Sequence, residues 1–558
     1  MGDALKRLRT TATRPVDGAS LLMFRIAFGL IIFWEVMRYA NNGWIKAYYL
    51  DTQFRFKYWP FDFVEPWGGD GMYWQFGILG LAALAIMTGF RYRIASVVAF
   101  FSLAYIFLLD QGRYLNHFYL VVLVSFLMMF LPFDRVASID PWKKNPPGTM
   151  PAWVLWLMRF QIGVPYFFGG VAKINGDWLR GQPLTAWLSN KGDFPVLGPL
   201  FENETVGFSM AYGGLLLDLC GVFLLMWRRT RVPTFIVVVS FHLTNSGLFK
   251  IGIFPWMMMA ATLLFFPADW PKRIWRDLRN ENRRAWLGVF IGAGVGLMLG
   301  NHFPSTDSSM HGMIMALIAA FIGYQLAVPK LANTPVTETD AEGDAQGEDG
   351  EADTSDFAKT SEDTDTSGST LSSPAPLATI PTIALMLWAS MQILVPLRHF
   401  AYPSNVHWTE EGHLFSWHMK LRQKRGHIVF VLTNRETGES HRVDQRGYLS
   451  KKQATRMSGR PDMIVQFAHY LADEFEAEHG APFAVQVESR ARLNDRDWAP
   501  LIDPNKDLTE VSRPWVPPVA WINPYPAAPR EPKPKGAKKK RKKRKKGKKG
   551  KKGKKKAK

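Results

Sequence analysis

Cysteine is almost absent from this chain: Cys220 is the only one among 558 residues. A single cysteine excludes an intramolecular disulfide and any zinc site built on several thiolates. The first residues are basic, and they lack the short apolar stretch and small-residue cleavage site of a removed signal peptide. We therefore expect the first apolar segment to be a retained helix.

Net positive charge is also small outside one segment. The formal net charge is +20, but residues 531–558 hold 19 Lys or Arg and one Glu, which leaves the rest of the chain nearly neutral. The basic character therefore belongs to a Lys-rich tail, 528–558, which we expect to be disordered. Such a tail can contact anionic lipids or other polyanions, or stay solvated without a dedicated partner.

Long apolar runs dominate residues 20–330, although the mean hydropathy of the whole chain is close to zero. A membrane-spanning helix needs about 20 mainly apolar residues. The alternation of Lys and Arg between successive loops places the N-terminus inside. The sequence predicts a polytopic all-α membrane bundle of about eleven spans. The predicted spans are 20–39, 74–90, 94–110, 115–132, 152–171, 208–227, 232–249, 251–267, 285–302, 310–328 and 377–397.

Polar segments flank this bundle and predict the rest of the domain organisation. Residues 1–19 form a basic cytoplasmic N-terminus, and the acidic stretch 331–376 cannot bury enough apolar surface to fold, which predicts a disordered linker. The last span, 377–397, then delivers residues 401–527 to the outer face as an α+β, strand-rich extramembrane domain. Its predicted elements are strands near 413–422, 427–433 and 482–490 and an amphipathic helix over 460–478.

Three ionisable side chains lie inside or at the ends of predicted spans. His117 begins the fourth span, Lys173 follows the fifth and His242 lies in the seventh. Ionisable groups are costly in a bilayer, so they mark candidate functional positions, and the loop charges place all three on the outer side. Each also has a structural interpretation. Histidines can bond carbonyl groups in a core, and a lysine can extend from a helix end to the interface.

Lys173 has the most specific surroundings. Gly169 and Gly170 precede it and allow a neighbouring helix to approach closely, while Phe167 and Phe168 keep the surroundings apolar. Burial disfavours the charged ammonium, so a lysine in such surroundings can act as a general base. Two histidines and a lysine, without a carboxylate at a fixed spacing, make a poor metal site, and no metal is expected.

Four motifs follow one another along the chain. They are NHFYL at 116–120, AKINGDWLRGQPL at 172–184, FHLTNSGLFKIGIF at 241–254 and NVHWTEEGHLFSWHMKL at 405–421. Together they resemble the vitamin K-dependent γ-glutamyl carboxylase family, including its bacterial members with the related transmembrane domain. The resemblance covers residues 20–270 and about 380–520, in the order of that family.

The resemblance implies an enzyme in the membrane. Lys173 would deprotonate a reduced vitamin K or menaquinone-type hydroquinone, which takes up O2 and becomes the epoxide. The strong base formed on the way would remove a γ-proton from a peptide glutamate, and the carbanion would capture CO2. The bacterial members imply an inner membrane and menaquinone. The partners would be a lipid quinone and a glutamate-containing peptide or protein.

The resemblance also carries residue roles over to this chain. His117 and His242 match histidines of the family, and we expect them to orient the quinone and stabilise charge. Residues expected to bind the hydroquinone are Asn116, Phe168, Asn175, Asp177, Trp178 and Asn245. Residues expected to contact the peptide are Trp408, Phe415 and Trp417.

Two departures from the family leave alternatives open. A single cysteine excludes the disulfide of the vertebrate members, and Phe415 stands where the animal enzymes have tyrosine. A quinone epoxidase, or a lipid- or quinone-binding membrane protein without carboxylation, is therefore the first alternative. A transporter with an ion path through His117, Lys173 and His242 is the second. No pair of broken helices recurs in the two halves of the chain, as many transporters require.

Overall fold

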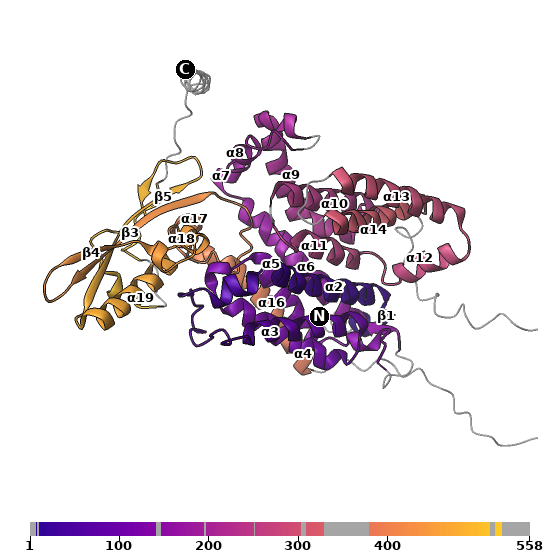
Figure 1. Cartoon of the computed structure of the whole chain (residues 1–558). Helices are drawn as coiled ribbons and strands as arrows, with labels where there is room; N and C mark the ends of the chain where they lie inside the picture. Colours follow the sequence, from indigo (N-terminus) through magenta and orange to yellow (C-terminus); the bar gives the residue numbers. More distant parts are fainter. Residues whose placement is uncertain are drawn as a thin grey trace, which may run out of the picture. The chain divides into compact units, whose positions relative to one another are not determined.

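The structure, a computed structural model, shows two compact units, which we describe separately (Figure 1). The helical unit takes in the chain up to Tyr402, together with Glu411–Leu421 and Tyr448–Ser450. The sheet unit takes in Pro403–Glu410, Arg422–Gly447 and the chain from Lys451 onward. The predicted acidic linker and Lys-rich tail lie outside the described residues. The described residues are 7, 10–140, 147–194, 197–249, 251–302, 308–328, 379–513 and 519–526.

The helical unit consists of α-helices joined mainly by short turns (Figure 1). A small antiparallel ribbon pairs β1 (Pro15–Asp17) with β2 (Thr149–Pro151). The helices are α2 (Ala19–Asn41), α3 (Gly71–Thr88), α4 (Tyr92–Leu108), α5 (Asn116–Phe130), α6 (Ala152–Lys173), α7 (Gly176–Leu179), α8 (Leu184–Leu188), α9 (Glu204–Met226), α10 (Arg231–Leu248), α11 (Phe254–Thr262), α12 (Trp270–Arg279), α13 (Arg283–His302), α14 (Ser308–Ala327) and α16 (Thr379–Leu397).

All eleven predicted apolar segments overlap helices, but the predicted number of about eleven membrane spans is not supported. Helix α5 has only 15 residues, and the segment 251–267 breaks into α11, of nine residues, and a 3₁₀ turn. Both are shorter than the roughly 17 residues that a spanning helix needs. Among the described residues, five helices are long and apolar enough to cross a membrane: Ala19–Asn41, Gly71–Thr88, Ala152–Lys173, Glu204–Met226 and Thr382–Ala401.

Glycines allow close contacts between helices of the helical unit. A Cβ atom built on Gly29 of α2 would lie 2.5 Å from the Ala83 carbonyl oxygen of α3. One built on Gly170 of α6 would lie 2.7 Å from Leu219 of α9. Only the missing side chain therefore lets α2 meet α3, and α6 meet α9, at these points.

The sheet unit is built around one four-stranded antiparallel sheet. The strand order is β4-β3-β5-β6, and Phe430 on β3 lies opposite Val487 on β5. The Phe430 ring packs on Phe467 of α19, with ring centroids 5.1 Å apart. The predicted strands 427–433 and 482–490 and the predicted helix 460–478 are confirmed. The elements are α17 (Val406–Thr409), β3 (Lys424–Asn434), β4 (Ser440–Val443), α18 (Lys451–Met457), α19 (Pro461–His479), β5 (Phe483–Leu493) and β6 (Ala499–Pro500).

The strand predicted near 413–422 is wrong, because this segment is a loop of successive turns. Phe415, Trp417 and Lys420 have φ angles of +62°, +58° and +52°, and an extended strand excludes such angles. Apolar and polar residues alternate here without forming a ladder. Residues 411–421, called the 411–421 loop below, are part of the helical unit.

Candidate functional site

Lys173 is buried at the C-terminal end of α6 and pairs with a carboxylate. Its ammonium group contacts the Asp218 carboxylate of α9, and both side chains are less than one-tenth exposed. The same nitrogen donates a hydrogen bond of 3.2 Å to the Gly169 carbonyl oxygen. It also lies 5.5 Å from the centre of the Trp178 ring. Lys173 therefore turns inward and does not extend to an interface.

The two glycines before Lys173 make this pair possible. A Cβ atom on Gly169 would lie 3.2 Å from an Asp218 carboxylate oxygen, and one on Gly170 would lie 2.8 Å from the Leu219 backbone nitrogen. A larger residue at either position would press α9 away from α6. The close approach expected from Gly169 and Gly170 thus places a specific partner beside Lys173.

Asp218 is a residue that the sequence analysis missed. A carboxylate in the middle of the apolar segment 208–227 is as unusual in a membrane helix as a lysine or a histidine. That signal was available in the sequence, but no spacing links Asp218 to Lys173, because the two residues are 45 positions apart. Only the packing of α6 against α9 joins them.

His242 is buried in α10 and has one nitrogen without a partner. Its Nε2 atom shares a hydrogen bond of 2.7 Å with the Tyr166 hydroxyl of α6. Its Nδ1 atom is buried and makes no hydrogen bond to any described residue. When the hydroxyl donates to Nε2, Nδ1 carries the proton and becomes a donor inside the bundle. Tyr166 and Lys173 lie two turns apart on one face of α6, a rise of about 10 Å.

His117 lies at the start of α5 and is linked to His242 through Phe254 of α11. The Phe254 ring centre is 5.8 Å from that of His117 and 5.9 Å from that of His242. In the described part of the chain no hydrogen bond joins Lys173 to either histidine. The structure thus links His117 to His242 through Phe254, and links His242 through Tyr166 to α6, the helix that also carries Lys173.

Positive charge surrounds His117. A Cβ atom built on Gly252 would lie 3.7 Å both from His117 Nε2 and from a guanidinium nitrogen of Arg38. The Lys420 ammonium also acts electrostatically on the His117 ring. Gly252 has φ = +61°, a conformation suited to glycine, so the space beside these groups stays open.

Arg38 and its partner Glu35 are two further residues that the sequence motifs did not indicate. They form an ion pair of 2.7 Å on α2, and both side chains are largely buried. The spacing of three residues places them on one helix face. Two opposite charges inside the first apolar segment are the signal that indicates them.

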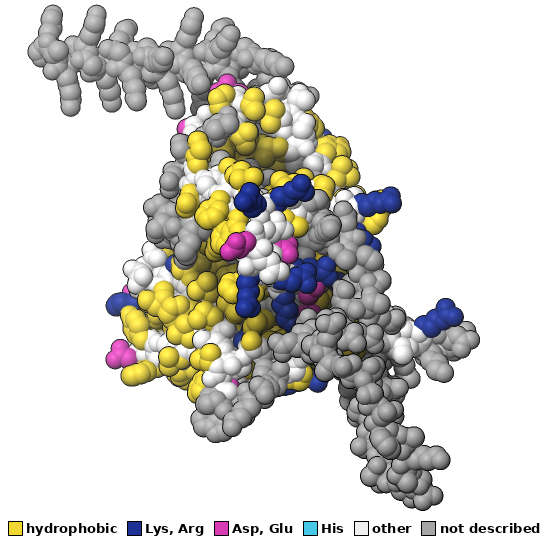
Figure 2. Space-filling view, turned by 90° about the vertical axis from the view of Figure 1, so that its right-hand side faces the viewer, with side chains coloured by type: hydrophobic (Ala, Val, Ile, Leu, Met, Phe, Trp, Pro, Cys, Tyr) yellow, Lys and Arg dark blue, Asp and Glu magenta, His cyan; other side chains and the backbone are white. Residues whose placement is uncertain are grey.

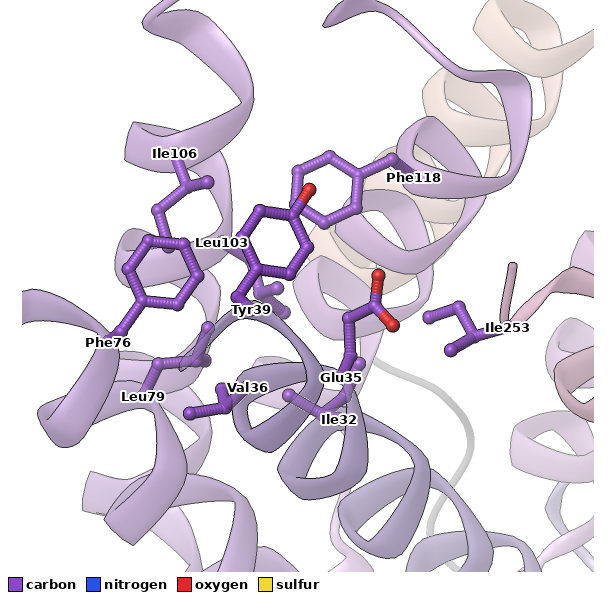
Figure 3. A pocket seen from close by; sticks show the side chains of 10 residues that line it. All are labelled: Ile32, Glu35, Val36, Tyr39, Phe76, Leu79, Leu103, Ile106, Phe118 and Ile253. Carbon is purple, nitrogen blue, oxygen red and sulfur yellow. The ribbon is translucent and has the colours of Figure 1, made fainter. Parts of the chain in front are cut away.

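A small cavity lies next to this pair (Figure 3). Its volume is about 10 Å³, which is room for about one water molecule. Its wall is formed by apolar atoms, although Glu35 and Tyr39 are among the residues that line it, and Figure 3 shows the Glu35 carboxylate extending toward Phe118 and Ile253. These two residues directly follow His117 and directly precede Phe254 in the chain, so the cavity adjoins the histidine region.

The 411–421 loop contacts both parts of the site. Met419 approaches Gly169 beside the Lys173–Asp218 pair, where a Cβ atom on Gly169 would lie 3.4 Å from its methyl carbon. The next residue, Lys420, lies near His117 and places its ammonium 5.4 Å from the Phe249 ring centre. The loop thus supplies an apolar group beside the Lys173–Asp218 pair and a positive charge near His117.

Asn116 helps to hold the 411–421 loop in place. Its amide nitrogen donates to the His418 carbonyl oxygen over 3.1 Å. Its amide oxygen accepts from the Tyr114 hydroxyl over 2.8 Å, and that hydroxyl accepts from the Phe415 backbone N–H over 2.9 Å. The structure therefore gives Asn116 a loop-anchoring contact, and its predicted role toward a quinone stays a prediction.

The residues after Lys173 form a tight structural turn. The Asn175 side chain accepts hydrogen bonds from the backbone nitrogens of Asp177 and Trp178 and caps α7. Asp177 pairs with Arg180 at 2.5 Å, and the Trp178 indole N–H donates to the Ala211 carbonyl oxygen. Of these residues, Trp178 is the one whose ring faces Lys173.

The other predicted site residues lie in different surroundings. Phe168 is buried in the main core of the helical unit, and Asn245 is half-buried in α10. Phe415 and Trp417 both pack on Tyr119, with ring centres 4.9 and 5.2 Å from it. Trp408 is fully buried in the sheet unit, where its N–H donates to the Asn523 carbonyl oxygen. Their roles toward a quinone or a peptide stay predictions.

Models of known protein families match two separate parts of the chain. A model of the HTTM domain matches residues 13–270, which carry the Lys173, His117 and His242 positions. A model of the vitamin K-dependent gamma-carboxylase lumenal domain matches residues 378–528. The chain belongs to the vitamin K-dependent gamma-carboxylase family. No solved structure matches the chain.

Membership of the gamma-carboxylase family settles the general character of the protein. It is a vitamin K-dependent carboxylase-like membrane protein, with apolar helices long enough to cross a bilayer. Among the described residues no group of three His, Cys, Asp or Glu side chains could hold a metal ion.

Proposed function

We propose that this protein uses a reduced vitamin K or menaquinone-type hydroquinone, together with O2, to carboxylate glutamate side chains of a peptide with CO2. The observation that carries the proposal is the buried Lys173–Asp218 pair at the end of α6. A buried ion pair is costly to desolvate and is weak evidence for stability. Lys173 lies in a family motif, which favours a chemical role for the pair.

The side chains present suit a hydroquinone, which is an aromatic ring with two hydroxyl groups. The unpartnered Nδ1 atom of His242 offers a hydrogen bond, and the Phe254 ring between the two histidines offers an aromatic face. The neighbouring cavity of about 10 Å³ is too small for such a ring. Side chains around it therefore have to move if the ring binds there.

Lys173 and Asp218 can hold the proton that starts the reaction. Transfer of one proton from Lys173 Nζ to an Asp218 oxygen leaves a neutral amine and a neutral acid. The free amine can then accept the hydroxyl proton of a bound hydroquinone, and the ammonium of Lys173 is regained.

The groups around His117 suit the negative charge that this step creates. Arg38 and Lys420 bring two positive charges to the His117 ring. Positive groups held in position before charge develops stabilise it without reorganisation of solvent. We assign Arg38 and Lys420 to stabilising the quinone anion, and His117 and His242 to orienting it.

Removal of a glutamate γ-proton is beyond the reach of any side chain near neutral pH. A bound hydroquinone supplies, with O2, the oxidation that drives this removal. The protein has to keep water away from the base that results. The buried aromatic side chains around Lys173 and His242 would do this.

We also infer an orientation and a compartment. The loop charges favour a cytoplasmic N-terminus, with Lys173 and residues 401–527 on the outer face. The resemblance to bacterial family members favours the inner membrane of a bacterium and menaquinone as the natural quinone.

The test is turnover by the purified full-length protein in detergent. It would be supplied with reduced vitamin K or menaquinol, O2, labelled bicarbonate and a glutamate peptide. We expect quinone epoxide and labelled peptide from the wild type. Lys173→Ala should lose both products by at least about 10²-fold, as expected for a missing proton acceptor. Lys191→Ala is the matched control, because Lys191 is exposed in the following segment.

The products decide between the alternatives. Epoxide without labelled peptide would show a quinone epoxidase and would overturn the carboxylation step. Neither product, from folded wild-type protein that still binds quinone, would leave a quinone-binding protein and overturn the enzyme. Equal turnover in wild type and Lys173→Ala would overturn the role of Lys173.

A further inference from the structure

An open groove of about 670 Å³ lies where α12 meets α13. This region, residues 271–377, falls between the two family matches. Figure 2 shows the face that carries these helices, with Lys and Arg side chains gathered beside hydrophobic ones. The groove is lined by Leu278, Arg279, Glu281, Arg283, Trp286, Leu287 and Phe290.

The polar end of the groove carries two arginine side chains and one carboxylate. Arg279 and Arg283 are exposed, and neither guanidinium has a hydrogen-bond or ion-pair partner among the described residues. Arg276 and Arg284 are exposed on the same two helices and add to the positive field. Glu281 is the one carboxylate in the lining, so the groove keeps a net positive charge.

The other end of the groove is apolar and exposed. Leu287 and Phe290 follow along α13, and their side chains are 60% and 65% exposed. Trp286 stacks on Phe290, with ring centres 5.3 Å apart, and its indole N–H donates to the Leu278 carbonyl oxygen. A tryptophan at the boundary between charged and apolar surface is typical of the headgroup region of a membrane protein.

The packing of α13 on α14 explains why this apolar face points outward. Gly288 and Gly292 of α13 lie so close to the α14 backbone that a Cβ atom on either would overlap Gly323 or Ala319. The small residues therefore form the contact between the two helices. The large side chains, Leu287 and Phe290, are left on the outside.

We propose that this groove binds one anionic phospholipid. The guanidinium groups of Arg279 and Arg283 hold its phosphate, since arginine matches the oxygen geometry of a phosphodiester. Trp286 lies at the level of the ester groups, and an acyl chain follows Leu287 and Phe290. The apolar half of the groove favours a lipid over free phosphate, because free phosphate has no apolar part that could bind there. The site is independent of the chemistry at Lys173.

The experiment measures binding of phosphatidylglycerol to the full-length protein in detergent by native mass spectrometry. Phosphatidylcholine and inorganic phosphate serve as comparison ligands. We expect one tightly bound phosphatidylglycerol that neither comparison ligand replaces. The double substitution Arg279→Gln and Arg283→Gln should weaken it roughly tenfold or more, given the contribution of each basic residue near a lipid headgroup. Arg228→Gln with Arg229→Gln is the control, because it removes two exposed charges elsewhere.

A second variant tests the charge of the site in the opposite direction. Glu281→Gln removes the negative charge from the lining and should tighten phosphatidylglycerol binding several-fold. The proposal is overturned if phosphatidylcholine binds as tightly, if free phosphate competes, or if both double variants lose the lipid equally. It is also overturned if Glu281→Gln leaves the affinity unchanged.

Discussion

At the scale of single residues, the pairing of Lys173 with Asp218 changes how the lysine has to be understood. The structure adds a carboxylate beside its ammonium group, and the Gly169 carbonyl and the Trp178 ring fix the position of the nitrogen. Under the proposed function the lysine is therefore one member of a proton-holding pair, and its carboxylate partner should matter for turnover.

Substitutions at Asp218 should distinguish the effect of the pair on turnover from its effect on the free energy of unfolding. Asp218→Asn leaves Lys173 buried without a counter-charge, which should lower the free energy of unfolding by about 3–5 kcal/mol and reduce epoxide formation at least tenfold. The double variant Lys173→Met with Asp218→Leu replaces the whole pair by apolar groups. It should regain most of the stability, measured by thermal unfolding, and stay inactive. Activity in the double variant would contradict the role of the pair.

The lowered pKa of Glu410 in the sheet unit predicts that the protein loses stability in acid. Burial raises the pKa of its carboxyl group, but Arg422 and Lys424, which both pair with it, outweigh this and lower the pKa from about 4.5 to about 2. Because the folded pKa lies below the ordinary value, the stabilisation is present above pH 4.5 and is lost as the pH falls toward 2. The shift corresponds to roughly 3 kcal/mol.

Thermal unfolding of the full-length protein between pH 6 and pH 3 measures this effect. The melting temperature of the wild type should fall steadily below about pH 4.5. Glu410→Gln should start lower and show a smaller fall, whereas Glu436→Gln, at an exposed position, should follow the wild type. A wild-type melting temperature that stays level down to pH 3 would be inconsistent with a lowered pKa at Glu410.

At the scale of elements, the contact between α6 and α9 determines the distance between Lys173 and Asp218. The two helices meet at Gly169 and Gly170, and Asp218 reaches Lys173 only because neither glycine carries a side chain. The 411–421 loop then adds Met419 beside Gly169. The chemistry of the site thus depends on a helix spacing that no single polar residue sets.

Gly170→Ala should disturb that spacing. The new methyl group would lie 2.7–2.8 Å from Leu219, including its backbone nitrogen, so the helices have to separate. We expect a loss of about 1–3 kcal/mol in unfolding free energy and a fall in quinone turnover, because Asp218 moves away from Lys173. Gly213→Ala on α9 is the control, since a Cβ atom there has no neighbour within 4 Å. Equal effects of the two substitutions would refute the spacing argument.

At the scale of the whole molecule, the sequence predicted where the helices lie better than it predicted their lengths and the residues that they contact. Apolar runs located all eleven segments, yet α5 and α11 end early. The motifs indicated His117, Lys173 and His242, whereas Asp218 and Arg38 enter the site only through packing between distant segments. The loop around Phe415 alternates like a strand, but its positive φ angles follow from tertiary contacts that a local pattern does not contain.

The orientation inferred from loop charges can be tested because the chain has a single cysteine. Cys220→Ser removes it, and new single cysteines can then be placed at exposed positions in two different loops. Asn190→Cys lies in a loop assigned to the outer side, and Arg229→Cys lies in one assigned to the cytoplasm. In intact cells a membrane-impermeant maleimide should label the first and not the second. Lysed cells should label both, which controls for accessibility. Labelling of Arg229→Cys alone would reverse the orientation and place Lys173 on the cytoplasmic side.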